Sequence, residues 1–282
     1  MRYAIFILSA FLLLTLPSYA QSRQTIVWAT YDFAPFFITS GPYKNLGTSD
    51  QLIKFYQDAL PQYDHRLETI NLARLNYLAQ HRDGELICMP LLLKTPQRQS
   101  FLTYSQALKP AYGHVLISKR SMNDKYDVFS LTDYLENTNN TLTIQKYRSY
   151  GHAIDAILKT HAESTHVQQD DFTTEQLYQL IKHGRIDAFI DTETSVTYEK
   201  RMQFLGDEYF YTPIDEDQLE RFGYTACTNS ASGKQAIQDI NQVLQDQDHT
   251  IRIQKIIESW VSPKNLKKFQ DFYRKNIALL QQ

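Results

Sequence analysis

The chain has 282 residues, of which 43% are hydrophobic and 21% charged, and its formal net charge is −2 at neutral pH. This charge balance gives no support for wholesale attraction to nucleic acid, so we expect no nucleic-acid partner. The length suits one large domain or two modest ones.

The N-terminal residues 1–20 have the three-part pattern of a secretory signal peptide. Arg2 gives a positive start, Ala4–Leu16 is almost wholly apolar, and Pro17 ends the run before Ser18-Tyr19-Ala20. The alternative is a membrane anchor, but this run falls short of the ~20 residues that cross about 30 Å of hydrocarbon. We expect cleavage after Ala20 and a soluble mature protein in the periplasm.

The rest of the chain alternates short apolar runs with helical stretches, as an α/β protein does. We expect strands at residues 25–30, 67–70, 86–89, 141–145, 186–191 and 224–228, with an extended crossover at 112–118. We expect helices that begin near Thr48 and Thr173, and others at 72–81, around 153–158, and at 234–244, 251–261 and 266–280.

Local signals support several of these boundaries. Thr48-x-x-Gln51 and Thr173-x-x-Gln176 resemble capping boxes, and Gly184 lies where a left-handed helix cap is favoured. Strand-helix-strand units occur in two sets, before Lys109 and after Thr141, with no Pro/Gly/Ser-rich linker between them. This arrangement favours two lobes joined by short crossovers.

Four segments in this order resemble a known family. They are Thr30–Phe36, then Asp83–Leu86 with Lys94–Arg98 and Phe101–Ser105, then His183–Asp191, and last Phe222–Ala226. Together they resemble the bacterial extracellular solute-binding proteins of family 3, amino-acid-binding type, whose fold is shared by the ligand-binding domains of ionotropic glutamate receptors.

The resemblance implies an α/β fold of the periplasmic-binding-protein-like type II, with two lobes, two crossovers and a cleft between the lobes. It places lobe one at residues 23–109 and 215–282, and lobe two at 110–214. It also implies that the ligand is a small solute, handed to an inner-membrane permease or sensor by a monomeric protein.

The resemblance also assigns ligand contacts. Arg98 matches the arginine that clamps the ligand carboxylate, which suits a guanidinium fork, and Asp191 matches the acid that holds the ligand ammonium. Arg148 and Ser149 lie where the family has donors at a helix N-terminus. One wall should contain Tyr31 and Phe36, and the facing wall Tyr147, Arg148 and Ser149. The alternatives are a surface or capping role for Arg98 and an N-cap role for Asp191.

Two departures from the family pattern bear on the ligand. Met89–Leu93 stands where amino-acid binders carry small hydroxyl residues, and Tyr147-Arg148 replaces the usual glycine and hydroxyl residue. Both changes take space and polarity from an α-amino-acid pocket. The ligand can therefore be another carboxylate or polar solute, with Tyr31, Phe33, Phe36, Tyr147 and Tyr150 as stacking walls.

The two cysteines, Cys88 and Cys227, form an even pair in an oxidising compartment, which favours a bridge. In the resembled fold both lie on neighbouring strands of lobe one. A disulfide and two small buried apolar residues are both compatible with the sequence.

Enzyme motifs are absent from the sequence: there is no Gly-x-Gly-x-x-Gly, Walker loop, His-Glu-x-x-His or Gly-x-Ser-x-Gly. We expect no cofactor, no metal and no catalytic residue. Some proteins of this fold are dehydratases, and a minority hypothesis gives Asp191 and Glu193 that proton-transfer role. A solute-sensing module for a membrane partner is a further alternative, since sensing and transport share the same cleft chemistry.

Overall fold

The computed structural model describes residues 23–81, 84–110, 113–119, 130–137, 141–162, 167–217 and 222–280. The expected signal peptide, residues 1–20, lies outside these described residues. Among the helices that are described, none combines the length and the hydropathy needed to cross a bilayer.

The first sheet has five strands in the order β2-β1-β3-β10-β4. Its strands are β1 (Thr25–Thr30), β2 (Asp64–Thr69), β3 (Ile87–Leu93), β4 (Leu102–Pro110) and β10 (Phe222–Thr228). The strands β1, β2 and β3 are parallel, whereas β10 runs antiparallel to both β3 and β4. The helices associated with this sheet are α1 (Thr48–Ala59), α2 (Leu72–His81), α3 (Pro96–Gln99), α8 (Ala231–Gln245), α9 (Gln247–Glu258) and α10 (Pro263–Leu280).

The second sheet also has five strands, in the order β7-β6-β8-β5-β9. Its strands are β5 (His114–Lys119), β6 (Leu142–Gln145), β7 (Val167–Asp170), β8 (Ala188–Thr192) and β9 (Tyr209–Pro213). Its helices are α4 (Leu131–Asn137), α5 (His152–Thr160), α6 (Thr174–Lys182) and α7 (Glu193–Met202).

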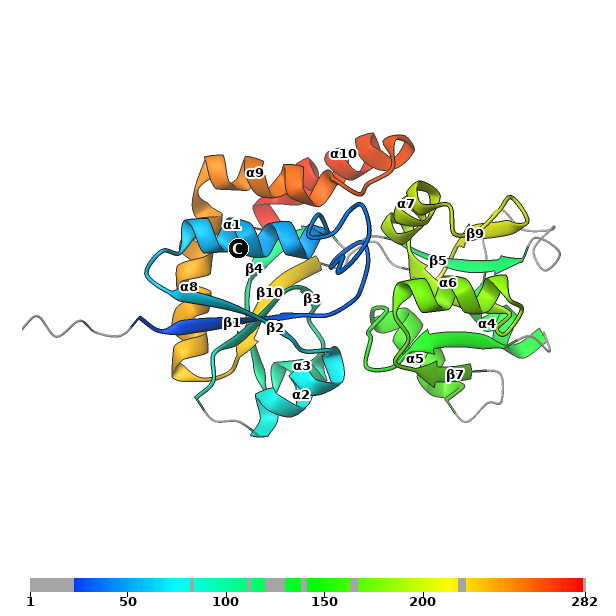
Figure 1. The fold of residues 1–282 in the computed structure, drawn as a ribbon, viewed down its shortest axis with the longest axis horizontal. Helices are drawn as coiled ribbons and strands as arrows, with labels where there is room; N and C mark the ends of the chain where they lie inside the picture. The colour runs from blue at the N-terminus through cyan, green and yellow to red at the C-terminus, as the bar shows by residue number, and fades with distance from the viewer. Residues whose placement is uncertain are drawn as a thin grey trace, which may run out of the picture.

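The two sheets form two lobes that lie side by side (Figure 1). The chain leaves the first sheet after β4 and returns to it from β9 through β10, so it crosses between the lobes twice. We call the β1-containing lobe lobe one and the β5-containing lobe lobe two. The two-lobed α/β fold expected from the sequence is thereby confirmed. The boundaries drawn at residues 109–110 and 214–215 stay a prediction.

The central strands of the second sheet, β5 and β8, are buried on both faces, which explains their short apolar runs. In β5, Leu116 packs in one cluster with α4 and α5, whereas its neighbours Val115 and Ile117 pack in another with α6. Alternate side chains of a strand point to opposite faces, so one apolar run supplies two cores. Lobe one has a single larger core around β1, β3, α1, α8 and α9.

The start of α1 fixes the loop that follows β1. The backbone N–H groups of Thr48 and Ser49 donate to the carbonyls of Pro35 and Phe36 at 2.9 and 2.8 Å. A Cβ atom at Gly47 would lie 2.3 Å from the Phe36 carbonyl oxygen, so only glycine allows this close approach. The expected Thr48–Gln51 capping box is wrong: Gly47 is the N-cap, and the Asp50 carboxylate accepts its N–H at 3.1 Å.

A disulfide joins Cys88 of β3 to Cys227 of β10. The two residues face each other in the antiparallel register, with their Cα atoms 4.1 Å apart, and both are completely buried. They are separated by 139 positions in the sequence. The covalent loop therefore encloses the whole second sheet.

Several contacts hold the lobes together away from the crossovers, among them two hydrogen bonds and an apolar cluster. The Thr174 hydroxyl donates to the Ala34 carbonyl at 3.0 Å, and the Asn71 amide donates to Asp171 at 2.8 Å. In the apolar cluster, Tyr198 of lobe two packs with three buried residues of lobe one, Ala34, Ile38 and Trp260. The structure is thus that of closed lobes.

Candidate functional site

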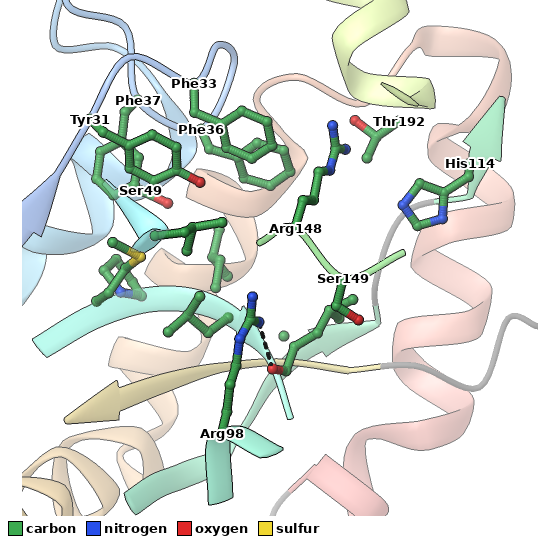
Figure 2. Close-up of a pocket in the computed structure, with 17 residues that line it drawn as sticks. Tyr31, Phe33, Phe36, Phe37, Ser49, Arg98, His114, Arg148, Ser149 and Thr192 are labelled. Carbon is green, nitrogen blue, oxygen red and sulfur yellow. Dashed lines mark hydrogen bonds between the residues drawn. The ribbon is translucent and has the colours of Figure 1, made fainter. Parts of the chain in front are cut away.

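The candidate site is a pocket of about 90 Å³ between the lobes (Figure 2). Most of its walls come from lobe one: Tyr31, Phe33, Phe36, Phe37, Ser49, Leu72, Met89, Pro90, Leu91, Leu92, Leu93, Arg98 and Gly223. Lobe two contributes His114, Arg148, Ser149 and Thr192. The lining is mostly apolar, with few polar groups, as small-molecule sites generally are.

The aromatic wall comes from the loop between β1 and α1. The rings of Tyr31 and Phe33 stack with centroids 5.4 Å apart, and those of Phe33 and Phe36 stack at 5.1 Å. The N–H groups of Phe36 and Phe37 both donate to the Phe33 carbonyl at 2.9 Å, which makes a tight turn. This turn, held by the α1 N-terminus, presents the rings to the cleft.

The aliphatic wall comes from an irregularity in β3. Between the pairs Tyr224–Leu92 and Ala226–Met89, two residues of β3 stand opposite one residue of β10, which is a β-bulge. Leu91 within it has a left-handed φ of 62°. A regular strand would point alternate side chains away, whereas the bulge lets Met89–Leu93 line the pocket without a break.

Arg98 reaches the pocket from α3, whose N-cap is Thr95. Its guanidinium donates from Nη1 to the Leu93 carbonyl at 3.1 Å and from Nη2 across the cleft to the Tyr147 carbonyl at 3.0 Å. The residue is only 6% exposed, and no carboxylate among the described residues pairs with it. Burial lowers the pKa of Arg98 from its ordinary value, because it disfavours the charged form.

Arg148 extends into the same pocket from the loop between β6 and α5 (Figure 2). Its Nη2 lies 3.0 Å from Asp191 Oδ1, and its Nη1 donates to Gln145 Oε1. The guanidinium carbon lies 4.8 Å from the ring centroids of both Phe33 and Tyr150. Burial alone would lower the pKa of Arg148, but Asp191 and Tyr150 raise it above its ordinary value.

Asp191, at the end of β8, is completely buried. Its Oδ1 accepts from Arg148, from the Thr192 N–H at 2.8 Å and from the Ser195 hydroxyl at 2.8 Å. Its Oδ2 has no hydrogen-bond partner among the described residues. The N-cap of α7 is Thr192, whose hydroxyl accepts the Ser195 N–H, so the N-cap alternative for Asp191 is wrong.

No family model matches the chain, and no curated protein matches it in sequence. Solved structures do match. An ancestral arginine-binding protein bound to arginine is 16% identical, with a TM-score of 0.67, over 85% of this chain and 99% of that one. ArtJ of Geobacillus stearothermophilus, an arginine-, lysine- and histidine-binding protein, is 17% identical, with a TM-score of 0.63, over 86% and 99%. The VFT2 domain of Bordetella pertussis BvgS, as a double mutant, is 18% identical, with a TM-score of 0.62, over 84% and 93%.

The chain has a periplasmic-binding-protein-like fold. At these identities the likeness shows the fold alone, so membership of family 3 stays a prediction. The solved neighbours of the amino-acid-binding type nevertheless agree with the resemblance inferred from the sequence.

Within this binding-protein fold, the pocket brings together five of the seven residues expected to bind ligand. Tyr31, Phe36, Arg98, Arg148 and Ser149 line it. Tyr147 and Asp191 do not. The Tyr147 side chain is 48% exposed, and its left-handed φ of 63° turns its carbonyl toward Arg98.

Sequence reasoning missed several lining residues. His114 and Thr192 come from the facing ends of β5 and β8 in lobe two, and Ser49 from the first turn of α1. His114 is 4% exposed and lies 3.3 Å from Asp217. The only local signal is that each stands at the end of a strand or the start of a helix, where binding residues of α/β folds tend to lie.

The two carboxylates considered for a dehydratase do not face the pocket. Asp191 pairs with Arg148, and Glu193 accepts from the Asn265 amide of α10 at 3.1 Å. Neither lines the pocket, so neither is placed to move a proton to or from a molecule bound there. The described residues also contain no cluster of three His, Cys, Asp or Glu side chains that could hold a metal ion.

Proposed function

We propose that this chain is a periplasmic solute-binding protein that captures a small carboxylate-bearing solute between its lobes for transport. The observation that supports this most strongly is Arg98. It lines the pocket, it is buried, and it forms no ion pair with a described carboxylate, although Asp155 lies near enough to raise its pKa.

A buried charge without a counter-ion is costly, with an effective penalty of several kcal/mol per ion. Neutral carbonyl acceptors at Leu93 and Tyr147 offset only part of this cost, because they carry no full charge. A carboxylate in the pocket would supply the missing charge and could accept two parallel N–H bonds from one guanidinium. Arg98 is therefore suited to hold an anionic ligand.

The contacts across the cleft support binding by lobe closure. Arg98 belongs to lobe one, yet it donates to a carbonyl of lobe two, so it would join the ligand and both lobes in one network. Release of the solute would require the lobes to separate. This would break the Arg98–Tyr147 and Thr174–Ala34 hydrogen bonds and the apolar contacts around Trp260.

The test begins with a thermal-shift screen of purified mature protein against amino acids, monocarboxylates, dicarboxylates, polyamines and small peptides. A ligand that binds only the folded state raises its apparent stability. For the best carboxylate, Arg98→Ala should weaken binding by more than tenfold, since a charge-assisted hydrogen bond contributes ~1.5–3 kcal/mol and about 1.4 kcal/mol is a factor of ten.

Arg98→Lys should restore only part of the affinity, because lysine lacks the planar fork. Arg185→Ala, at an exposed arginine of lobe two, is the matched control and should leave affinity unchanged. Equal binding by Arg98→Ala and the parent would contradict the assignment.

Solute sensing for a membrane partner is the second candidate. The observation that favours it is the match to the periplasmic domain of B. pertussis BvgS, which covers 92% of this chain but 47% of that one, at 17% identity and a TM-score of 0.61. A unit of this fold can therefore be part of a longer periplasmic protein. Cross-linking of the mature protein in intact cells, with and without the ligand, would separate capture by a permease from capture by a receptor.

A further inference from the structure

The surroundings of the Arg148 guanidinium are those expected for a bound organic cation. One aromatic face comes from each lobe, Phe33 from lobe one and Tyr150 from lobe two, each 4.8 Å from the guanidinium carbon. A buried carboxylate, Asp191, lies 3.0 Å away, and the Arg148 side chain is only 7% exposed. Aromatic faces and a desolvated carboxylate are the groups by which proteins bind guanidinium and ammonium ions.

This cation position is occupied by the chain itself. Arg148 stands between Asp191 and the pocket, and Asp191 does not reach the lining. The same Oδ1 that pairs with Arg148 also accepts from Thr192 and Ser195, which fixes the carboxylate in place. An incoming ammonium group would have to displace Arg148 to reach this acid.

The charges of the pocket then leave a single position for a ligand charge. Arg148 and Asp191 balance each other, and His114 stands next to Asp217. Arg98 forms no ion pair among the described residues, and Asp155 acts on it only from beyond hydrogen-bond distance. The remaining walls are aromatic rings and the aliphatic run Met89–Leu93, around about 90 Å³. An apolar cavity of roughly 150 Å³ admits benzene, so this smaller pocket suits a short organic group.

We propose that Arg148 is a built-in occupant of the cation position and that the pocket selects a short apolar monocarboxylate without an α-ammonium group. The inference rests on the proposed function, in which Arg98 holds a carboxylate. It removes Asp191 from the set of ligand-binding residues and makes Arg148 a specificity-determining residue.

The parent protein tests the ligand class directly. Isothermal titration compares 3-methylbutanoate with L-valine, two acids that differ only in the α-ammonium group. We expect 3-methylbutanoate to bind at least tenfold more tightly, because the ammonium of valine would be buried beside two guanidinium groups with no acid to pair with. Butanedioate should bind more weakly than 3-methylbutanoate, since Arg148 is already paired. Equal or tighter binding of L-valine or butanedioate would overturn the inference.

The variant Arg148→Ser tests the occupant itself. Removing the side chain should open the space between Phe33 and Tyr150 and expose Asp191, so the preference for 3-methylbutanoate over L-valine should fall by at least tenfold. Millimolar ethylguanidinium should raise the melting temperature of Arg148→Ser but not of the parent, because it can replace the missing guanidinium. Arg185→Ser is the matched control and should behave like the parent in both measurements.

The outcomes separate the two proposals. If neither these two acids nor any carboxylate of the thermal-shift screen binds the parent, the proposed carboxylate function fails, while ethylguanidinium still tests the occupant. If both acids bind the parent equally and Arg98→Ala abolishes both, the carboxylate site stands and the occupant inference fails. Should Arg148→Ser not fold, Arg148→Gln carries the same expectation with a smaller change in preference, and the comparison on the parent remains decisive.

Discussion

At the scale of single residues, the two arginines of the cleft differ in what balances their charge. Arg148 has Asp191, two aromatic faces and a glutamine oxygen around it, and it belongs to the fold. Among the described residues, the Arg98 guanidinium donates to two backbone carbonyls and forms no ion pair. The same residue type therefore has two different surroundings within one pocket, and only Arg98 is proposed to bind a ligand.

Two buried threonines give a matched prediction. The Thr174 hydroxyl donates across the cleft to Ala34, whereas the Thr143 hydroxyl has no partner among the described residues. Thr174→Val leaves a buried carbonyl without its donor, so it should cost about 1–3 kcal/mol, and Thr143→Val should be neutral or slightly stabilising. Urea unfolding midpoints check both, and small-angle scattering should show a larger radius of gyration for ligand-free Thr174→Val only. Equal midpoints for the two variants would contradict the bond across the cleft.

The residues of the candidate site were only partly predictable from the sequence. A motif match suffices to place Arg98, Tyr31 and Phe36 in the pocket. Nothing local indicates that Arg148 would turn to Asp191, 43 positions away, because that pairing depends on how β6 and β8 lie in the sheet. A motif assigns each position separately, so it does not show which distant side chain a residue will pair with.

At the scale of elements, helix α4 depends on a carboxylate from a distant segment. Glu216, which follows β9, accepts the N–H groups of Leu131 and Thr132 at 3.0 and 3.2 Å and the Ser130 hydroxyl at 3.0 Å. These bonds satisfy donors that a helix N-terminus leaves without partners and place a negative charge at the positive end of its dipole. The segment that returns to lobe one is thereby tied to α4.

This cap predicts a pH dependence. Burial alone would raise the pKa of Glu216, but the N–H and hydroxyl donors together lower it from its ordinary value. Because the folded pKa is the lower one, the stabilisation is fully present above the ordinary value of about 4.3 and is lost as the pH falls through the folded value. At pH 7, Glu216→Gln should have a lower melting temperature than the parent. Its free energy of unfolding should be lower by about 0.5–2 kcal/mol, which is typical of helix caps, and this gap should close toward pH 3.

The control for the cap is Glu136→Gln, at an exposed acid on α4 itself. Melting curves of this variant should follow those of the parent across the same pH range. A gap between Glu216→Gln and the parent that stays constant down to pH 3 would show that the carboxylate is not the source of the stabilisation.

Several elements with clear apolar runs were predicted from the sequence. The strand at residues 25–30 and the helix at 72–81 have the expected bounds, Gln176 completes the capping box of Thr173, and Gly184 has the left-handed φ. Helix α4 and the strands β4, β7 and β9 were missed, and helix α7 was expected only through the N-cap alternative for Asp191. The buried face of α7 is mostly hydroxyl-bearing, and β7 is a largely exposed strand at the sheet edge, so neither shows a hydrophobic repeat.

At the scale of the whole molecule, the disulfide joins two strands of lobe one, and lobe two is inserted between these strands in the sequence. Cys88 and Cys227 are 139 positions apart, and in the chain-entropy account a loop of this length contributes about 2–5 kcal/mol. Dithiothreitol should lower the unfolding midpoint of the parent but not that of Cys88→Ala/Cys227→Ala. An unchanged midpoint after complete reduction, verified by thiol titration, would contradict this role.

The two-lobed plan followed from the order of segments, since two sets of strand-helix-strand units with no flexible linker between them favour two lobes joined by short crossovers. The contacts that join the closed lobes could not be predicted in this way. Trp260 and Tyr198 meet only when the lobes are together, and each looks like an ordinary core residue in its own helix or turn. Closure is a property of the assembled pair of lobes.

The central claim is that Arg98 binds the carboxylate of a solute enclosed by both lobes. A crystal structure of the mature protein with the monocarboxylate that stabilises it most in the thermal-shift screen tests this most directly. We expect the carboxylate to lie on the Arg98 guanidinium, with the apolar part against Phe36 and Leu92 and with Arg148 still paired to Asp191. A carboxylate bound to Arg148 instead, or a ligand that contacts one lobe only, would contradict it.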